Sequence, residues 1–312
     1  MMWLWILLGV IGGLIILSLV SLYYVYYQVF YSPHKGQNND FVLTPATDKY
    51  CDRSEVMFLI NRIRDYPYED AYITSYDHLK LHARIYRQNS DTVAIMCHGY
   101  RGTSCRDFSG GAYDMIKFGF NVVLIDERGH GLSKGHSITF GVKEKRDLRN
   151  WIDYARKEFG EDKRIILVGI SMGGATVLLT SDYLKEGDLV IADCPYTKER
   201  EIIEETLKTT LKMNPKVFYP IANLSSIIFG HANLSKDDAD KNVSNSKAKF
   251  LIIHGDSDTV VPHKLSYRIY ENHKDKVQYE LFPGVDHGIS YLGDNERYKR
   301  VVSNFVNQKE SK

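Results

Sequence analysis

The longest apolar run of the chain lies at its N-terminus, where residues 3–22 include no charged side chain. A helix of this length, at ~1.5 Å per residue, crosses a hydrocarbon layer of about 30 Å. Tyrosines follow the run, and such rings suit the boundary between membrane and water. A cleaved signal peptide is the alternative, but no Lys or Arg precedes the run, and the run is longer than those peptides use. Residues 1–31 are therefore predicted to be a retained single-pass transmembrane anchor with an aromatic interface belt.

The next stretch, residues 32–47, is polar with two prolines, and it predicts a linker to a body over residues 48–312. Lys35, Lys49 and Arg53 follow the span, whereas only the terminal amine precedes it. The positive-inside rule would leave the body on the cytoplasmic side. Exported enzymes with signal anchors show the same pattern, so the side of the membrane stays open.

Short, continuous apolar runs recur through the body, and strands covered on both faces have this pattern. They lie at residues 92–97, 121–125, 164–168, 189–192 and 250–253. Residues 79–86 alternate apolar and polar side chains instead, which predicts a half-buried strand at a sheet edge. A last strand is expected at residues 277–282.

Helical periodicity separates these strands, with apolar residues at three- and four-residue spacing in residues 108–118, 143–159, 172–185 and 263–273. This alternation predicts an α/β fold with a mostly parallel central sheet and helices on both faces. More than fifty residues separate the strands near 193 and 249, and residues 199–213 and 217–229 look helical. A parallel crossover needs only about a dozen residues. The surplus predicts a helical lid insertion over about 196–247, with a decorative insertion as the alternative.

Composition argues against several other classes of protein. With 44% hydrophobic residues the chain can bury a core, and a formal net charge of +1 excludes a globally basic nucleic-acid binder. The four cysteines lack paired CxxC spacing and no helical histidine pair occurs, so neither a metal nor a cofactor is predicted. Disulfide status and oligomeric state stay open. The cysteines are Cys51, Cys97, Cys105 and Cys194.

Two copies of the G-x-S-x-G pattern occur, at residues 131–135 and 169–173. A nucleophile elbow needs a strand just before the serine and a helix just after it. Ser171 meets both demands, because the run 164–168 precedes it and Gly173 opens a predicted helix. Ser133 follows a loop-like segment instead. Ser171 is therefore the candidate nucleophile, and the other copy is interpreted as a turn-rich loop.

Serine needs a general base within hydrogen-bond reach. His287 follows the last predicted strand, and sites in open α/β sheets form at the carboxyl ends of strands. His98 and His254 also follow strands, but each is expected to cap its strand end. His287 is the predicted base.

For the carboxylate that orients the base, Asp258 lies in the loop after the strand near 250–253. Asp193 is the runner-up, and Asp256 is expected to brace its own turn. Asp286 is adjacent to the histidine and cannot easily face its ring. We therefore predict a Ser171–His287–Asp258 triad.

An oxyanion hole requires two backbone amides. One is that of Met172, directly after the nucleophile. The second is expected from the loop after residues 92–97, where glycines allow close approach. The amide of Tyr100 is the prediction, with Arg101 as fallback.

Five motifs in order resemble the α/β-hydrolase superfamily over residues 70–306. They are His98-Gly99-Tyr100, Asp126-Glu-Arg-Gly-His-Gly-Leu-Ser133, Gly169-Ile-Ser171-Met-Gly173-Gly174, His254-Gly-Asp-Ser-Asp258 and Asp286-His287-Gly288. The chain is most similar to bacterial membrane-anchored hydrolases of the serine-aminopeptidase-like and acyl-thioester-hydrolase-like groups. The resemblance implies acyl transfer to Ser171, an oxyanion hole in the first motif, and a lid between Asp193 and Lys249. The lipase signature HGGG is absent, which argues against a true lipase.

Three functions follow for comparison. A membrane-anchored esterase or thioesterase acting on small or lipid-like acyl substrates is favoured, because the anchor would hold the body near lipid. A serine peptidase or amidase of the same fold is the alternative, since one triad serves both. Its carboxylates for a free N-terminus would come from Glu199, Glu201, Glu204 and Glu205. A non-catalytic, membrane-tethered binding protein is the third.

Overall fold

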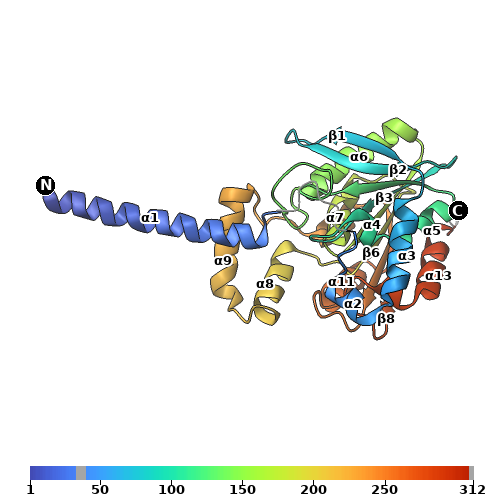
Figure 1. Cartoon of the computed structure of the whole chain (residues 1–312). Coiled ribbons are helices and arrows are strands. Elements are labelled where there is room, and N and C mark those ends of the chain that lie inside the picture. Colours follow the sequence, from blue (N-terminus) through green and yellow to red (C-terminus); the bar gives the residue numbers. More distant parts are fainter. Residues whose placement is uncertain (33–39, 309–312) are drawn as a thin grey trace.

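The computed structural model describes residues 1–32 and 40–308. Helix α1 (Met2–Val29) projects away from the body, with the N-terminus at its far end (Figure 1). Among the described residues it is the one helix long and apolar enough to cross a membrane, and none of its most apolar window is buried. A signal sequence would pass the same test of length and composition.

The body is built around one sheet, in which eight strands of the described chain have the order β1-β2-β4-β3-β5-β6-β7-β8. The pairs β1–β2 and β2–β4 are antiparallel, and every other pair is parallel. This confirms the predicted α/β-hydrolase architecture. The strands are β1 (Glu69–Thr74), β2 (Lys80–Tyr86), β3 (Thr92–Cys97), β4 (Asn121–Asp126), β5 (Arg164–Ile170), β6 (Leu189–Asp193), β7 (Lys249–Gly255) and β8 (Val277–Phe282).

Helices cover both faces of the sheet, which explains why its central strands are continuous apolar runs. In β3, Val93 and Ile95 enter one core cluster, whereas Ala94 and Met96 enter the other. One face carries α6 (Glu144–Phe159), α7 (Met172–Thr180), α10 (Ala239–Asn245) and α11 (Lys264–Asn272). The other carries α3 (Arg53–Arg64), α4 (Ser104–Asp107), α5 (Gly111–Lys117) and α13 (Asn295–Val306), with the short α12 (Ser290–Gly293) nearby.

Some elements differ from the sequence prediction. The edge strand β1 was not predicted, because Ala71 is its one buried side chain and no alternation reveals it. The prediction of a half-buried edge strand at residues 79–86 is therefore wrong, because β2 lies between β1 and β4 and most of its side chains are buried. The helix expected over 108–118 begins at Gly111, after the separate α4. The helix expected over 172–185 ends at Thr180, and a 3-10 turn, η1 (Ser181–Tyr183), continues it.

The segment between α1 and the body does not stay apart from the fold. Residues 33–39 of the predicted linker lie outside the described residues. Ser32 and Asp40 on either side of them are fully buried. Farther on, α2 (Pro45–Tyr50) begins after Thr44, whose hydroxyl accepts the amide of Thr47. The described part of the segment is therefore packed against the body.

The long insertion forms α8 (Glu199–Thr209), α9 (Pro215–Ser225) and the π-helical turn η2 (Ser226–Gly230). Figure 1 shows α8 and α9 at the end of the molecule where α1 meets the body. A third core cluster joins the insertion to the N-terminal helix, and it includes Tyr26 in α1 and Phe30 just after it. The insertion therefore packs around the base of the N-terminal helix.

Candidate active site

Ser171 lies in a sharp turn between β5 and α7, where its φ is +56°. A non-glycine residue held in a sparsely populated backbone region costs on the order of 1–3 kcal/mol. Small neighbours make the turn possible: a Cβ on Gly169 would lie 2.2 Å from the Gly173 carbonyl oxygen, and one on Gly173 would lie 1.9 Å from that of Cys97. The amide of Ser171 donates to the Asp193 carbonyl at 2.8 Å. This geometry is the predicted elbow.

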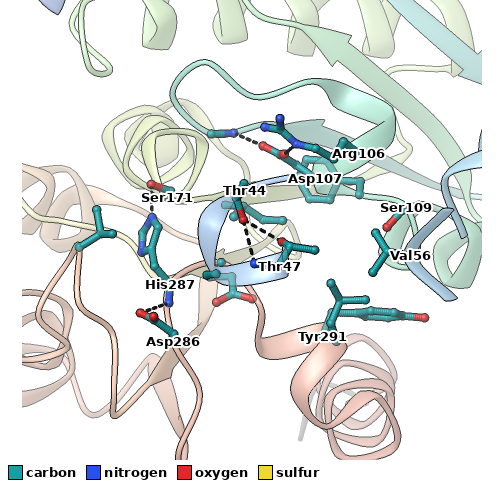
Figure 2. Close-up of a pocket in the computed structure, with 18 of the residues that line it drawn as sticks. Thr44, Thr47, Val56, Arg106, Asp107, Ser109, Ser171, Asp286, His287 and Tyr291 are labelled. Carbon is teal, nitrogen blue, oxygen red and sulfur yellow. Dashed lines mark hydrogen bonds and ion pairs between the residues drawn. The ribbon is translucent and has the colours of Figure 1, made fainter. Parts of the chain in front are cut away.

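The structure brings together the three side chains predicted to act as a unit. His287 Nε2 lies 2.8 Å from Ser171 Oγ, and His287 Nδ1 lies 2.7 Å from Asp258 Oδ2. Figure 2 shows the imidazole below the serine hydroxyl. Asp258 follows β7 and His287 follows β8, so both loops lie at the carboxyl ends of parallel strands.

Electrostatics fix the tautomer of this imidazole. Burial disfavours the charge of Asp258, but hydrogen bonds to His254 and His287 outweigh burial and hold its pKa well below the usual range. Its other oxygen accepts the amides of Val260 and Val261 at 2.9 and 2.7 Å. Because Asp258 is ionised, Nδ1 of His287 carries the proton and Nε2 is free to accept one.

The pKa of His287 responds to the same groups. Burial lowers this pKa, but the hydrogen bond and the negative charge of Asp258 raise it above the ordinary value. The imidazolium that forms on proton uptake is therefore stabilised. That is the property a general base of this kind requires.

The competing candidates occupy other positions. Asp193, the runner-up, accepts the Ser290 hydroxyl at 2.9 Å, and burial raises its pKa to about 6. Asp256 accepts the Ser257 hydroxyl at 2.9 Å within its own turn, and it also accepts the Gly284 amide at 2.7 Å from the turn after β8. His98 accepts the Glu127 amide through Nε2 at 3.0 Å.

Ser133 and His254 also have structural partners. Ser133 is buried, donates to the Asp126 carbonyl at 2.6 Å and accepts the His82 amide at 2.8 Å. His254 is fully buried, and its Nε2 lies 2.8 Å from the Val261 carbonyl oxygen. Ser133 does not face the site, whereas Nε2 of His254 also lies 3.2 Å from Asp258 Oδ2, so His254 contacts the carboxylate of the triad.

Sequence reasoning missed the role of Asp286, because it excluded only a direct contact with the ring. Its Oδ1 accepts the amide of His287 at 2.8 Å and that of Thr259 at 2.9 Å. The carboxylate therefore ties the loop of the base to the loop of the acid. No pattern in the sequence around Asp286 indicates this contact.

The predicted oxyanion segment follows β3 and lies beside the serine. A Cβ on Gly99 would lie 3.5 Å from the Cβ of Ser171. The Gly99 amide already donates to Asp107 Oδ2 at 2.9 Å, so the next amide, that of Tyr100, is the candidate donor. Met172 is the first residue of α7, where helix amides lack intrahelical partners. The fallback, Arg101, has a positive φ of +52°.

A cavity of about 310 Å³ opens at Ser171 and His287. Figure 2 shows the α2 segment with Thr44 and Thr47 between the serine and Tyr291. The described residues that line it come from segments 44–56, 99–111, 170–171, 259–260 and 286–298 together with Asp193, and residues 196–247 are not among them. The insertion predicted as a lid lies beside α1, and none of its residues lines this cavity, whereas residues 44–56 do.

Within the part of the chain that the structure describes, one group of side chains could offer ligands to a metal: Cys194, Asp258 and His287 have candidate atoms within 4.8 Å of one another. Burial raises the pKa of the Cys194 thiol well above its usual value, so it does not supply the thiolate that metals bind. The Asp258–His287 pair is already engaged in its own hydrogen bond. The group therefore fits a proton-transfer pair better than a metal site. The sequence left open whether the four cysteines form disulfides, and in the structure all four are free thiols.

Comparison with known proteins follows this geometry. The family model described as serine aminopeptidase, S33, matches residues 88–223. The uncharacterized protein YqkD of Bacillus subtilis is 24% identical over 70% of this chain and 72% of its own length. The zebrafish lysophosphatidylserine lipase ABHD12 is 28% identical over 59% of this chain, and the match spans 48% of that enzyme. The esterase Pf2001 of Pyrococcus furiosus superimposes with a TM-score of 0.64 and 25% identity, covering 79% of this chain and 94% of that one.

Proposed function

We propose that this chain, which belongs to the α/β-hydrolase superfamily, is a membrane-anchored serine hydrolase that cleaves a carboxylic ester or thioester. The observation that carries the proposal is the continuous hydrogen-bonded chain from Asp258 through His287 to Ser171. A non-catalytic binding protein has no use for a strained serine held beside an oriented base.

The proposed mechanism is acyl transfer in two steps. His287 Nε2 takes the Ser171 proton as the oxygen attacks the substrate carbonyl carbon, and Asp258 stabilises the imidazolium. The amides of Tyr100 and Met172 bind the oxyanion, each worth roughly 3–4 kcal/mol of barrier reduction. The imidazolium then protonates the leaving alcohol or thiol. In the second step His287 deprotonates water, which attacks the acyl-enzyme, and the imidazolium returns the proton to Ser171 Oγ as the acid is released.

Apolar side chains in the cavity support an acyl substrate. Val56, Phe108, Leu292 and Tyr298 line the cavity that opens at the serine. A volume of about 310 Å³ lies at the lower end of the ~300–1,000 Å³ range of small-molecule sites. Two of the similar proteins are named an esterase and a lysophospholipid lipase, which agrees with ester chemistry. Helix α1, as an anchor, would hold this cavity close to lipid.

Aminopeptidase activity is the second candidate, because the matching family model carries that description. A substrate with a free N-terminus would want an uncommitted carboxylate in the cavity. The lining carboxylates are engaged: Asp107 with Arg106, Asp193 with Ser290, and Asp286 with two backbone amides. Glu199 is fully buried outside the cavity. These contacts favour an ester substrate.

The test compares p-nitrophenyl esters of increasing chain length with aminoacyl-nitroanilides, using the full chain in detergent and a Ser171→Ala control. We expect ester turnover that Ser171→Ala abolishes, with little hydrolysis of the anilides. Preferential turnover of the anilides would replace the esterase by a peptidase. A protein with a membrane-spanning anchor stays in the membrane during alkaline carbonate extraction. Release of the full chain by this treatment would therefore contradict the proposed anchor.

A further inference from the structure

One face of α9 and η2 exposes a row of large apolar side chains. Val217, Ile221, Leu224 and Ile228 have 53%, 37%, 46% and 37% of their surface exposed. Their spacing of four, three and four residues places them on one side of a helix. The opposite side packs inward, where Tyr219, Ala222 and Ser225 are buried. We call the exposed row the apolar stripe.

The α9–η2 segment that carries the stripe contacts the N-terminal helix through Ser225 and Phe229, which are not members of the stripe. The Ser225 hydroxyl donates to the Leu22 carbonyl at 2.9 Å, and the rings of Tyr23 and Phe229 meet edge to face with centroids 5.2 Å apart. Figure 1 shows α9 crossing the end of α1 rather than continuing along it. The twenty uncharged residues that end at Leu22 measure about 30 Å as a helix, which is the thickness of the hydrocarbon layer. A membrane crossed by α1 would therefore have its boundary at the level of α9.

Beside the stripe is a second cavity, of about 460 Å³, which we call the cationic cleft. Ile227 of η2 lines it and directly precedes Ile228 of the stripe, so the cleft borders the stripe. Its one lining carboxylate, Asp237, is paired with Lys145 at 2.6 Å. Of the other lining cations, Lys143 lies 3.9 Å from the Asp77 carboxylate, whereas Arg146 and Lys236 have no ion pair among the described residues. Such a cleft attracts anionic groups, and phosphate oxygens match its cations.

We propose that the insertion is a membrane-docking element: the apolar stripe enters the bilayer interface beside α1, and the cationic cleft holds anionic phospholipid headgroups. This inference rests on the proposed role of α1 as an anchor. Stripe and cleft supply the two components of interfacial binding, buried apolar area and attraction to anionic lipid. Together they would hold the body in one orientation relative to the bilayer, with the insertion as its membrane-contacting part.

The test uses the full chain in nanodiscs of zwitterionic lipid, with and without anionic phosphatidylglycerol. In a Cys51→Ser background, Ile221→Cys is labelled with an environment-sensitive fluorophore. Tyr183→Cys is the matched control, because it is exposed and lies at the far end of α7 from Ser171. We expect a blue-shifted emission at residue 221 that nitroxide-bearing lipids quench, and no effect at residue 183. A label at 221 as water-exposed as that at 183 would overturn docking. Co-elution with the discs reports α1 anchoring separately.

The cleft is tested with a label at Ile227→Cys. Anionic lipid should increase quenching there, and the double variant Arg146→Glu/Lys236→Glu should remove the increase. Lys117→Glu on α5 is the control for charge alone, and it should leave the increase in place. Headgroup binding would be contradicted if anionic lipid did not increase quenching at residue 227, or if the double variant kept the increase. A change in particle size without quenching would indicate a protein partner on this face instead.

Discussion

Removal of the N-terminal helix should have opposite consequences depending on where the cut falls. The sequence places the end of the anchor at residue 31. In the structure, however, Phe30 is fully buried and Tyr26 is 5% exposed. We predict that a truncated protein beginning at Leu22 keeps its fold and activity, whereas one beginning at Ser32 loses both.

The magnitude follows from the contacts between these residues and the body. The Phe30 ring packs edge to face on Phe140. Three hydrogen bonds add to this contact: Tyr26 with Ser137, Tyr100 with the Val29 carbonyl, and the Ile138 amide with the Phe30 carbonyl. A deleted buried Phe costs roughly 3–5 kcal/mol and each hydrogen bond about 1 kcal/mol. The loss of roughly 6–8 kcal/mol is comparable with the ~5–15 kcal/mol that holds a typical domain folded.

The oxyanion segment depends on the same contacts. Tyr100 stacks on Phe140 with ring centroids 5.0 Å apart, and its hydroxyl donates to the Val29 carbonyl at 2.7 Å. Arg101 donates to the Gln28 carbonyl at 2.8 Å. The cut at Ser32 should therefore lower turnover even in molecules that remain folded.

Urea unfolding followed by circular dichroism, together with p-nitrophenyl ester turnover, would measure both effects in one detergent. The protein beginning at Leu22 is the control for loss of the apolar span. Equal unfolding midpoints and equal turnover for the two truncated proteins would refute the claim that residues 22–31 belong to the body.

Three further predictions concern the site. Asp258→Asn should lower kcat by roughly 10⁴-fold, because an amide fixes the wrong tautomer of His287, whereas Asp193→Asn should be far milder in the same steady-state assay. Activity requires the neutral imidazole, and the pKa of His287 is raised above 6.5, so kcat/KM should fall as pH drops through a pKa above that value. In Asp258→Asn this acid limb should move to lower pH, and an unmoved limb in pH–rate profiles would contradict the coupling. Gly173→Ala should cost about 1–3 kcal/mol in urea unfolding, because its Cβ would meet the Cys97 carbonyl.

The elbow and the central strands could be predicted because local rules determine them. Strand, small residue, serine, small residue and helix follow one another within a few positions around Ser171. Covered strands such as β3 and β5 show as unbroken apolar runs. His287 and Asp258 could be placed because each follows a strand whose carboxyl end reaches the same edge of the sheet.

The covering of the cavity could not be predicted from local pattern. Residues 44–56 carry no signal that they lie beside Ser171, since their place depends on contacts with distant segments. The insertion was predicted to be a lid from its length and from the family resemblance. Its apolar residues pack instead on Tyr26 and Phe30, which the sequence assigns to an anchor separate from the body. Whether an apolar residue lies in the membrane or in the protein core depends on tertiary contacts, so the hydrophobic pattern of the sequence cannot predict it.

The central claim, that Ser171 is the nucleophile, is tested most directly by the site of a covalent adduct. The full chain would be treated with a fluorophosphonate, digested and mapped by mass spectrometry, alongside Ser171→Ala and His287→Ala. The account predicts an adduct on the peptide that contains Ser171, none in Ser171→Ala, and greatly slowed labelling in His287→Ala. An adduct on another residue, or equal labelling of wild type and Ser171→Ala, would contradict it.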